Sequence, residues 1–332
     1  MSSTSLAEGP VEGDGAVVEE RIVVRVRRPR SDRVYRGVVR TAGSATLVLM
    51  ALIGLFLLLQ ALPALREARW SFLTETEWNP EAKRFGIATL LFGTALIAVE
   101  ALLIAVPLAI GAALFVTEYS PARLRRPLTS AIDLLAAVPS LIYGLWGRFF
   151  LQPRLVKISD WLTTHVAFIP IFKTKTNLLG GTTFVAGIVV AIMVLPLCTA
   201  IFREVFSQAP PGEKEGALAL GGTRWGMIRT VVLPFGRGGI IGGSMLGLGR
   251  ALGETIAVAL IISPIYHDMI HILDRGGNSI SALIALLFGE STPFGINALM
   301  AAGLVLFIVT LLVNALASVI VSKSRSGSAT EI

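Results

Sequence analysis

Long apolar runs separated by short polar segments make up most of the chain. A helix needs about 20 apolar residues to cross the hydrocarbon core of a bilayer. Prolines inside such a run are tolerated where neighbouring helices satisfy the freed backbone groups. The pattern therefore predicts an all-α polytopic membrane protein with six transmembrane helices. The predicted spans lie at about 42–65, 87–116, 128–150, 182–204, 238–263 and 296–321.

Two stretches interrupt this pattern. The third run contains Val138-Pro139-Ser140, which predicts a proline-kinked span. The segment 264–294 is apolar only from Ser279 to Gly289, too short to span, so we expect a partly helical outer segment packed on the bundle. His267 and His271 in this segment are four residues apart, a spacing that would suit a metal on one helix face. No other metal-ligand pattern accompanies them, and we predict an interfacial helix without a metal.

Both ends of the chain are polar. Residues 1–35 are acidic in their first half and basic in their second half, and they contain too little apolar material to fold, so we predict a disordered tail. The apolar run behind this tail is long enough to span, which indicates a membrane helix rather than a cleaved signal peptide. Residues 323–332 form a second short tail, and residues 36–322 are predicted to form the membrane domain.

Composition and charge support a membrane protein and indicate its orientation. Of the 332 residues, 54% are hydrophobic and 15% are charged, whereas soluble domains carry about a quarter charged residues. Lys and Arg gather in the segments that share a side with the N-terminus, so both termini are predicted to be cytoplasmic. The loop 148–175 is an exception, because it is basic although it is predicted to lie on the outer side. It is either a long loop that translocates regardless of charge or a basic outer surface for an anion or an acidic partner.

The segment 207–235, between the fourth and fifth runs, carries strong local helix signals. Pro210-Pro211 ends one helix and can begin the next. Gly221-Gly222 then ends this short helix, and Thr223 can cap a second one that Pro234 terminates or kinks. These signals predict an exposed helix–turn–helix on the cytosolic face, a shape that docks into another protein.

The same segment resembles the signature of ABC-importer membrane subunits, which is E-A-A, three residues, G, nine residues, I-x-L-P. The matching positions are Glu215, Gly216, Ala217, Gly221, Val231, Leu233 and Pro234. The resemblance implies the type I ABC importer permease fold, in which the short helix is a coupling helix inserted into a groove of a cytosolic ATPase. It implies that the ATPase-coupling residues are Glu215, Gly216, Ala217, Gly221, Leu233 and Pro234.

Two further stretches, Ala137 to Gly147 and Gly247 to Val258, resemble the PstC type of phosphate-importer permease. The resemblance covers residues 36–322. It implies a multi-pass protein of the bacterial plasma (inner) membrane that imports phosphate with a PstA-type sister permease, a dimer of PstB-type ATPases and a PstS-type phosphate-binding protein on the outer face. No Gly-x4-Gly-Lys-Ser/Thr motif occurs in the chain, so we expect no ATP hydrolysis by this chain, and ATP with Mg²⁺ on the partner ATPase.

Three charged residues lie deep in the predicted spans, where a charge is costly and marks a functional site by default. Arg250 and Glu254 are four residues apart in the fifth run, so on one helix they would be neighbours and could pair. The guanidinium suits phosphate oxygens, and Glu254 would hold Arg250 in place or compete with phosphate for it. The resemblance associates both residues with transport, and the alternative is a purely structural ion pair. Glu100, in the second run, either pairs with Arg250 or faces a wet cavity.

Two smaller features of the spans carry expectations of their own. Gly243, Gly247 and Ala251 form a stripe of small residues beside the Arg250 site. Such a stripe would let another helix approach closely, from within the bundle or from the sister permease. Asp133 lies near the inner end of the third run and is predicted to be solvated.

Three other functions fit parts of the sequence. The cytosolic signature is shared by permeases for molybdate, sulfate or amino acids, so only the stretches that resemble PstC favour phosphate. A secondary transporter driven by protons would use Glu100 and Glu254 as a relay, but it leaves the cytosolic helix–turn–helix without a role. A signalling component that reports phosphate status is compatible with the sequence as a second role.

Overall fold

The computed structural model describes residues 30–166, 168–169, 172, 180–262, 272–274 and 276–324. Most of the two predicted polar tails, together with His267 and His271, lies outside these residues. The predicted N-terminal tail, residues 1–35, extends too far along the chain, because helix α1 already begins at Arg30. The chain divides into two units, one that ends at Ala51 and one that begins at Leu52. In the first unit every residue from Val34 to Ala51 is exposed, as expected of an apolar helix whose environment is lipid.

The described residues are mostly helical, with one two-stranded antiparallel sheet that pairs Trp78 with Phe85. The elements before the third predicted span are α1 (Arg30–Ala68), α2 (Ser71–Thr74), β1 (Trp78–Asn79), β2 (Arg84–Phe85), α3 (Ala88–Leu114) and the π-helical turn η1 (Phe115–Tyr119). Next come α4 (Ala122–Ala136), α5 (Ser140–Trp146), the π-helical turn η2 (Gly147–Leu151), α6 (Gln152–His165) and α7 (Thr183–Ser207). The last are α8 (Pro211–Ala219), α9 (Arg224–Met227), the π-helical turn η4 (Ile228–Val232), α10 (Leu233–Leu252), α11 (Ile256–Ile261), α12 (Ile280–Leu287) and α13 (Pro293–Ser324).

Five of the six predicted runs correspond to helices that are long and apolar enough to cross a membrane within the described residues. These helical stretches are Val34–Ala68, Ala88–Tyr119, Thr183–Ser207, Arg224–Leu252 and Pro293–Val321. The third run is different, because the kink predicted there is a break between two helices, and the predicted limits of 128–150 are wrong. It consists of Ala122–Ala136 and Ser140–His165, which are bent by 88° at the break between them. Pro139 explains the break, since proline lacks an N–H and disfavours helical geometry in the residue before it.

The fifth predicted span, 238–263, also has different limits. Its helix begins at Arg224, runs through α9, η4 and α10, and ends at Leu252. Pro234 therefore does not terminate the helix. The π turn η4 ends two residues before this proline, and a locally widened turn accommodates a residue that cannot donate an i→i−4 hydrogen bond. Beyond Leu252 the chain breaks and resumes as the short helix α11.

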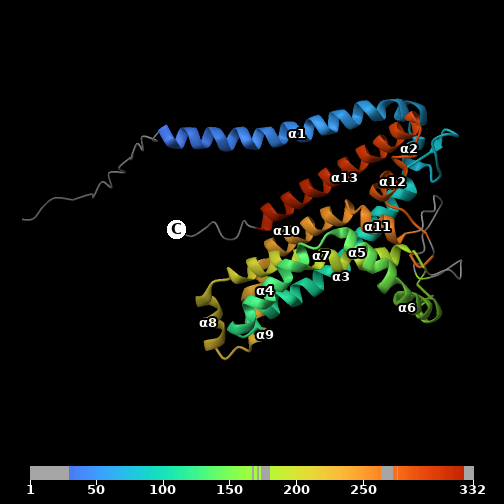
Figure 1. Cartoon of the computed structure of the whole chain (residues 1–332). Helices are drawn as coiled ribbons and strands as arrows, with labels where there is room; N and C mark the ends of the chain where they lie inside the picture. The colour runs from blue at the N-terminus through green and yellow to red at the C-terminus, as the bar shows by residue number, and fades with distance from the viewer. Residues whose placement is uncertain are drawn as a thin grey trace, which may run out of the picture. The chain divides into compact units, whose positions relative to one another are not determined.

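Helices α3, α7 and α10 pack against one another, and α13 packs on α10 (Figure 1). The face of α3 that meets α7 consists of fully buried alanines, among them Ala98, Ala101, Ala105 and Ala109. The predicted stripe of small residues on α10 has the same function within the bundle. A Cβ atom at Gly243 would lie 2.8 Å from the Phe202 ring, and one at Gly247 would lie 2.8 Å from the Cys198 Sγ atom. The helix that approaches this stripe is therefore α7 of the same chain.

A second buried cluster joins the loop region after α1 to the C-terminal part of the chain. It contains Phe72, Trp78, Phe85 and Ile87 together with Leu283 and Leu299. Helix α12 is the predicted outer segment, and its residues Ile280 to Leu283 are buried against the bundle. Its N-terminus is capped by Ser279, whose Oγ atom accepts a hydrogen bond from the Ala282 amide at 3.2 Å. The prediction of a partly helical segment packed on the bundle is confirmed.

Candidate functional site

The two stretches that resemble PstC permeases lie against each other in the fold. Gly144 on α5 faces Ala257 on α11, and a Cβ atom at position 144 would lie 2.8 Å from the Ala257 Cα atom. Arg148 in η2 donates from Nη1 to the carbonyl oxygens of Leu260 (3.1 Å) and Ile261 (3.3 Å), in the last turn of α11. A cation at this position satisfies carbonyls that have no partner within the helix. The two stretches thus form one packed unit, and one residue of the basic loop is used to hold it.

Arg250 lies in the last turn of α10, next to this unit. Its side chain is half-buried, and among the described residues no hydrogen bond or ion pair joins it to another residue. In the neighbouring unit, the Tyr143 hydroxyl donates a hydrogen bond to the Leu135 carbonyl at 2.8 Å. A cation in the last turn of a helix is favoured by the helix dipole. Within the part of the chain that the structure describes, the arrangement presents a positive charge without a carboxylate partner.

Glu254 does not pair with Arg250, so the predicted ion pair is wrong. Because α10 ends at Leu252, the two residues are not neighbours on one helix. The Glu254 side chain is buried, and its Oε1 atom accepts a hydrogen bond from the Ala257 amide at 3.1 Å, at the start of α11. A carboxylate there satisfies an N–H that has no partner in the helix and meets the positive end of its dipole. The Glu254 carbonyl also accepts from Ser281 Oγ at 2.7 Å, so this residue fixes the chain between α10, α11 and α12.

Glu100 on α3 does not pair with Arg250 either. Both of its carboxyl oxygens are buried, and neither has a hydrogen-bond partner among the described residues. The carboxyl group lies against Gly187 on α7, where even a Cβ atom would collide with it. The structure therefore places Glu100 inside the packing between α3 and α7, which is neither of the two predicted settings.

Helices α8 and α9 form the predicted helix–turn–helix. Gly221 has φ +82°, a left-handed conformation that favours glycine, and a Cβ atom at Gly222 would lie 2.5 Å from the Ala217 carbonyl oxygen. Thr223 Oγ1 accepts from the Gly226 amide at 3.0 Å and caps α9, as predicted. The exposed coupling residues are Glu215, Gly216, Gly221 and Pro234, and the half-buried ones are Ala217 and Leu233.

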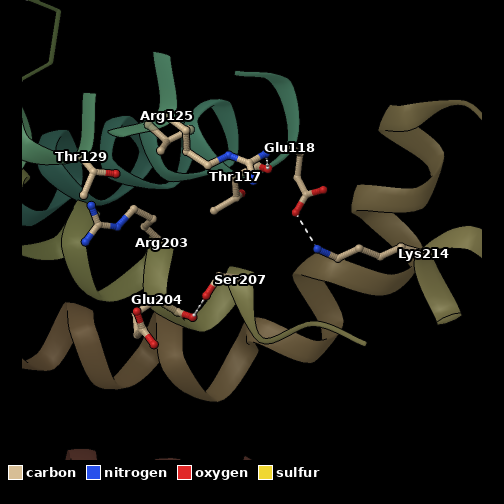
Figure 2. Close-up of a pocket in the computed structure, with 9 residues that line it drawn as sticks. Thr117, Glu118, Arg125, Thr129, Arg203, Glu204, Ser207 and Lys214 are labelled. Carbon is tan, nitrogen blue, oxygen red and sulfur yellow. Dashed lines mark hydrogen bonds and ion pairs between the residues drawn. The ribbon is translucent and has the colours of Figure 1, made fainter. Parts of the chain in front are cut away.

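A pocket of about 340 Å³ lies where α8 meets the ends of α3 and α7 (Figure 2). Its charged lining residues are Glu118, Arg125, Arg203, Glu204 and Lys214. Lys214 Nζ lies 2.7 Å from Glu118 Oε1, and Arg203 Nη2 lies 3.6 Å from Asp133 Oδ1. Arg125 Nη2 donates to a backbone carbonyl of η1 at 2.9 Å. The cations of the pocket are thus engaged within the chain. Asp133 is exposed, as predicted, and in addition it pairs with Arg203.

The Lys214–Glu118 ion pair was not predicted from the sequence. The two residues are 96 positions apart, so no local pattern connects them. The available signal was positional, because Glu118 lies at the end of the second apolar run and Lys214 directly precedes the glutamate of the cytosolic signature. Both were expected on the cytosolic side.

Comparison with known proteins decides the family. The family described as binding-protein-dependent transport system inner membrane component matches residues 105–326. The chain is 43% identical to the phosphate transport system permease protein PstC 2 of Mycobacterium tuberculosis, over 90% of this chain and 94% of that relative. It is also 43% identical to PstC of Xylella fastidiosa, over 86% of this chain and 89% of the relative. The chain belongs to the PstC permease family.

Membership in the PstC family confirms the resemblance noted in the sequence. The matched residues, 105–326, include Arg250, Glu254 and the coupling segment, whereas Glu100 lies before them. Together with the apolar helices, the family match makes the chain a multi-pass membrane component of an ABC transporter.

Solved structures of ABC transporters share the fold of this PstC family member. A chain of a bacterial alginate ABC transporter, crystallised with an alginate pentasaccharide-bound periplasmic protein, matches with a TM-score of 0.59 and 16% identity over 91% of this chain and 99% of that chain. A chain of the inward-facing MetNI methionine ABC transporter matches with a TM-score of 0.50 and 13% identity over 71% and 96%. These matches confirm the predicted ABC importer permease fold.

Proposed function

We propose that the chain is the membrane-spanning permease subunit of an ATP-driven importer of inorganic phosphate. The observation that carries this proposal is the 43% identity, over 90% of this chain, to a relative named as a phosphate transport system permease. The subunit would lie in the bacterial plasma (inner) membrane with both termini in the cytoplasm. It would form the translocation pathway together with a PstA-type sister permease.

Arg250 is the residue of this chain that would contact the anion. A half-buried cation in a membrane span is costly unless a negative charge meets it, and no carboxylate among the described residues pairs with Arg250. The planar guanidinium can donate two parallel hydrogen bonds to phosphate oxygens. The absence of the Arg250–Glu254 pair in this structure weighs against the alternative of a purely structural ion pair.

Glu254 has a different role in this proposal from the one expected from the sequence. Its carboxylate holds the start of α11, and its carbonyl holds Ser281. Glu254 would therefore keep the end of α10 in place, so that Arg250 faces the pathway in a fixed position. It would neither neutralise Arg250 nor relay protons.

The exposed helix α8 would dock into a PstB-type ATPase, which binds and hydrolyses ATP with Mg²⁺. A PstS-type binding protein would deliver phosphate at the opposite face. Closure of the ATPase dimer on ATP would displace α8 and, through the turn at Gly221, the helix that starts at Arg224. Because this helix is continuous from Arg224 to Leu252, its displacement would move Arg250 and open the pathway to the other side, as in other rigid-body switching mechanisms.

The proposal is tested by transport in proteoliposomes that contain the chain, its sister permease and the ATPase, with the binding protein outside. Uptake of radiolabelled phosphate that requires ATP and resists excess sulfate or molybdate is the expected result. Inhibition of phosphate uptake by excess sulfate or molybdate would instead assign the permease to that oxyanion. Uptake that continues without the ATPase would contradict the proposal and favour a transporter driven by protons.

A further inference from the structure

The side chain of Lys214 connects the coupling helix α8 to the membrane spans. Its Nζ atom lies 2.7 Å from Glu118 Oε1 and 3.5 Å from the Phe206 carbonyl oxygen. Figure 2 shows Lys214 and Glu118 pointing toward each other from α8 and η1. The two side chains are only 19% and 9% exposed. This enclosure distinguishes the pair from the surface ion pairs that contribute little.

Apart from Lys214, α8 contacts mainly the start of the fifth span, because it packs on α9 and η4, the first turns of the helix Arg224–Leu252. Glu213, Glu215 and Leu218 are exposed. Ala217 packs at the edge of the core. Within the described residues, Lys214 is the only residue of α8 whose side chain makes a hydrogen bond or an ion pair with a span.

The two atoms that Lys214 contacts belong to different helices. Glu118 lies in η1, the π-helical turn that ends the second span, and such turns often occur at functional sites. Phe206 lies in the last turn of α7, and its ring packs against α10, where a Cβ atom at Gly236 would lie 2.6 Å from it. One ammonium group, which has three N–H donors, therefore joins α8 to α3 and to α7. Through Phe206 it also reaches the helix that carries Arg250.

We propose that the Lys214–Glu118 ion pair couples the movement of α8 to the second membrane span, with Lys214 as a positioning residue for transport. A close-packed interior transmits displacement instead of absorbing it, and breaking an enclosed ion pair leaves a charge without a partner. Displacement of α8 by an ATPase would therefore pull η1 and the end of α7 along with it. This inference rests on the proposed role of α8 in ATPase coupling.

The first test measures phosphate taken up per ATP hydrolysed in the reconstituted complex. Lys214→Met and Glu118→Gln remove the ion pair with little change in size, and we expect each to lower this ratio roughly threefold to tenfold, as residues that couple two sites do. The double variant should be no worse than either single variant, because the two residues act as one unit. Lys214→Arg keeps the charge and should restore at least part of the ratio.

A matched control comes from the exposed pair of Lys83 and Glu67, whose atoms are 2.8 Å apart but whose side chains are 66% and 42% exposed. Lys83→Met should leave the ratio unchanged. If Lys214→Met lowered uptake and ATP hydrolysis by the same factor, the ratio would stay constant and the proposal would be wrong. The proposal would also be wrong if Lys214→Met changed neither rate. Should Lys214→Met fail to assemble, Glu118→Gln carries the same test with the lysine in place.

A second readout needs no transported substrate. Hydrogen exchange of peptides that contain η1 is compared with and without ATP in the assembled complex. The wild type should show an ATP-dependent change in η1 that Lys214→Met loses, while the change in α8 persists. If η1 responds equally in both proteins, the coupling proposal fails. If the wild type shows the change but imports no phosphate, the proposed substrate is wrong and the coupling proposal stands.

Discussion

Substitutions of Glu254 separate its charge from its hydrogen bond. Glu254→Gln keeps an oxygen that can accept from the Ala257 amide, a bond of 3.1 Å, but removes the charge, whereas Glu254→Ala removes both. Because the residue is only 8% exposed, the alanine variant leaves a buried N–H without a partner, which costs about 1–3 kcal/mol. Since the glutamine variant retains the acceptor and loses only the helix-dipole interaction, we expect it to cost less than about 1 kcal/mol.

The assay compares the unfolding midpoint of the purified complex with ATP-driven phosphate uptake. We expect Glu254→Gln to stay close to the wild type in both measurements, and Glu254→Ala to lose stability together with uptake. Glu290→Ala, at an exposed position after α12, is the control and should change neither. If Glu254→Gln and Glu254→Ala abolished uptake equally while unfolding at the wild-type midpoint, the charge would be essential and the anchoring role refuted.

Three further predictions concern packing, the turn and the buried acid. Gly247→Ala should lower the unfolding midpoint relative to Gly249→Ala. A Cβ atom at position 247 would lie 2.8 Å from Cys198 Sγ, whereas the nearest atom to a Cβ atom at position 249 is 3.7 Å away. The overpacking at 247 costs about 1–3 kcal/mol, while both substitutions gain up to about 1 kcal/mol from helix propensity. Gly221→Ala, at φ +82°, should cost about 1–2 kcal/mol and weaken ATPase binding in a pull-down titration. Glu100→Gln should keep phosphate uptake within about twofold, because the carboxyl group has no hydrogen-bond partner among the described residues and glutamine preserves its shape; complete loss of uptake would instead support a proton relay.

The apolar runs and the coupling segment could be predicted from the sequence because their causes are local. A run of apolar residues must be helical in lipid, where each backbone group needs an internal partner. The turn at Gly221-Gly222 and the cap at Thr223 likewise depend on residues a few positions apart. The approach of another helix to Gly243 and Gly247 followed from the small size of these residues alone.

The site geometry could not be predicted because its causes are distant in sequence. The break after Leu252 lies inside an apolar run, and it is stabilised by Glu254, whose carbonyl is held by Ser281, 27 residues away. Reading the run as one helix therefore placed Glu254 beside Arg250, where it does not lie. The angle at Pro139 depends in the same way on the packing of α5 against α11, since a proline permits a bend without setting its size.

Phosphate uptake by the reconstituted Arg250→Gln complex shows whether Arg250 contacts the transported anion. A hydrogen bond to a charged group contributes about 1.5–3 kcal/mol, so we expect ATP-dependent uptake to fall roughly tenfold to a hundredfold. The control Arg237→Gln, at an exposed position on the same helix, should transport normally. An assembled Arg250→Gln complex that imports phosphate at the wild-type rate would show that Arg250 does not contact the anion.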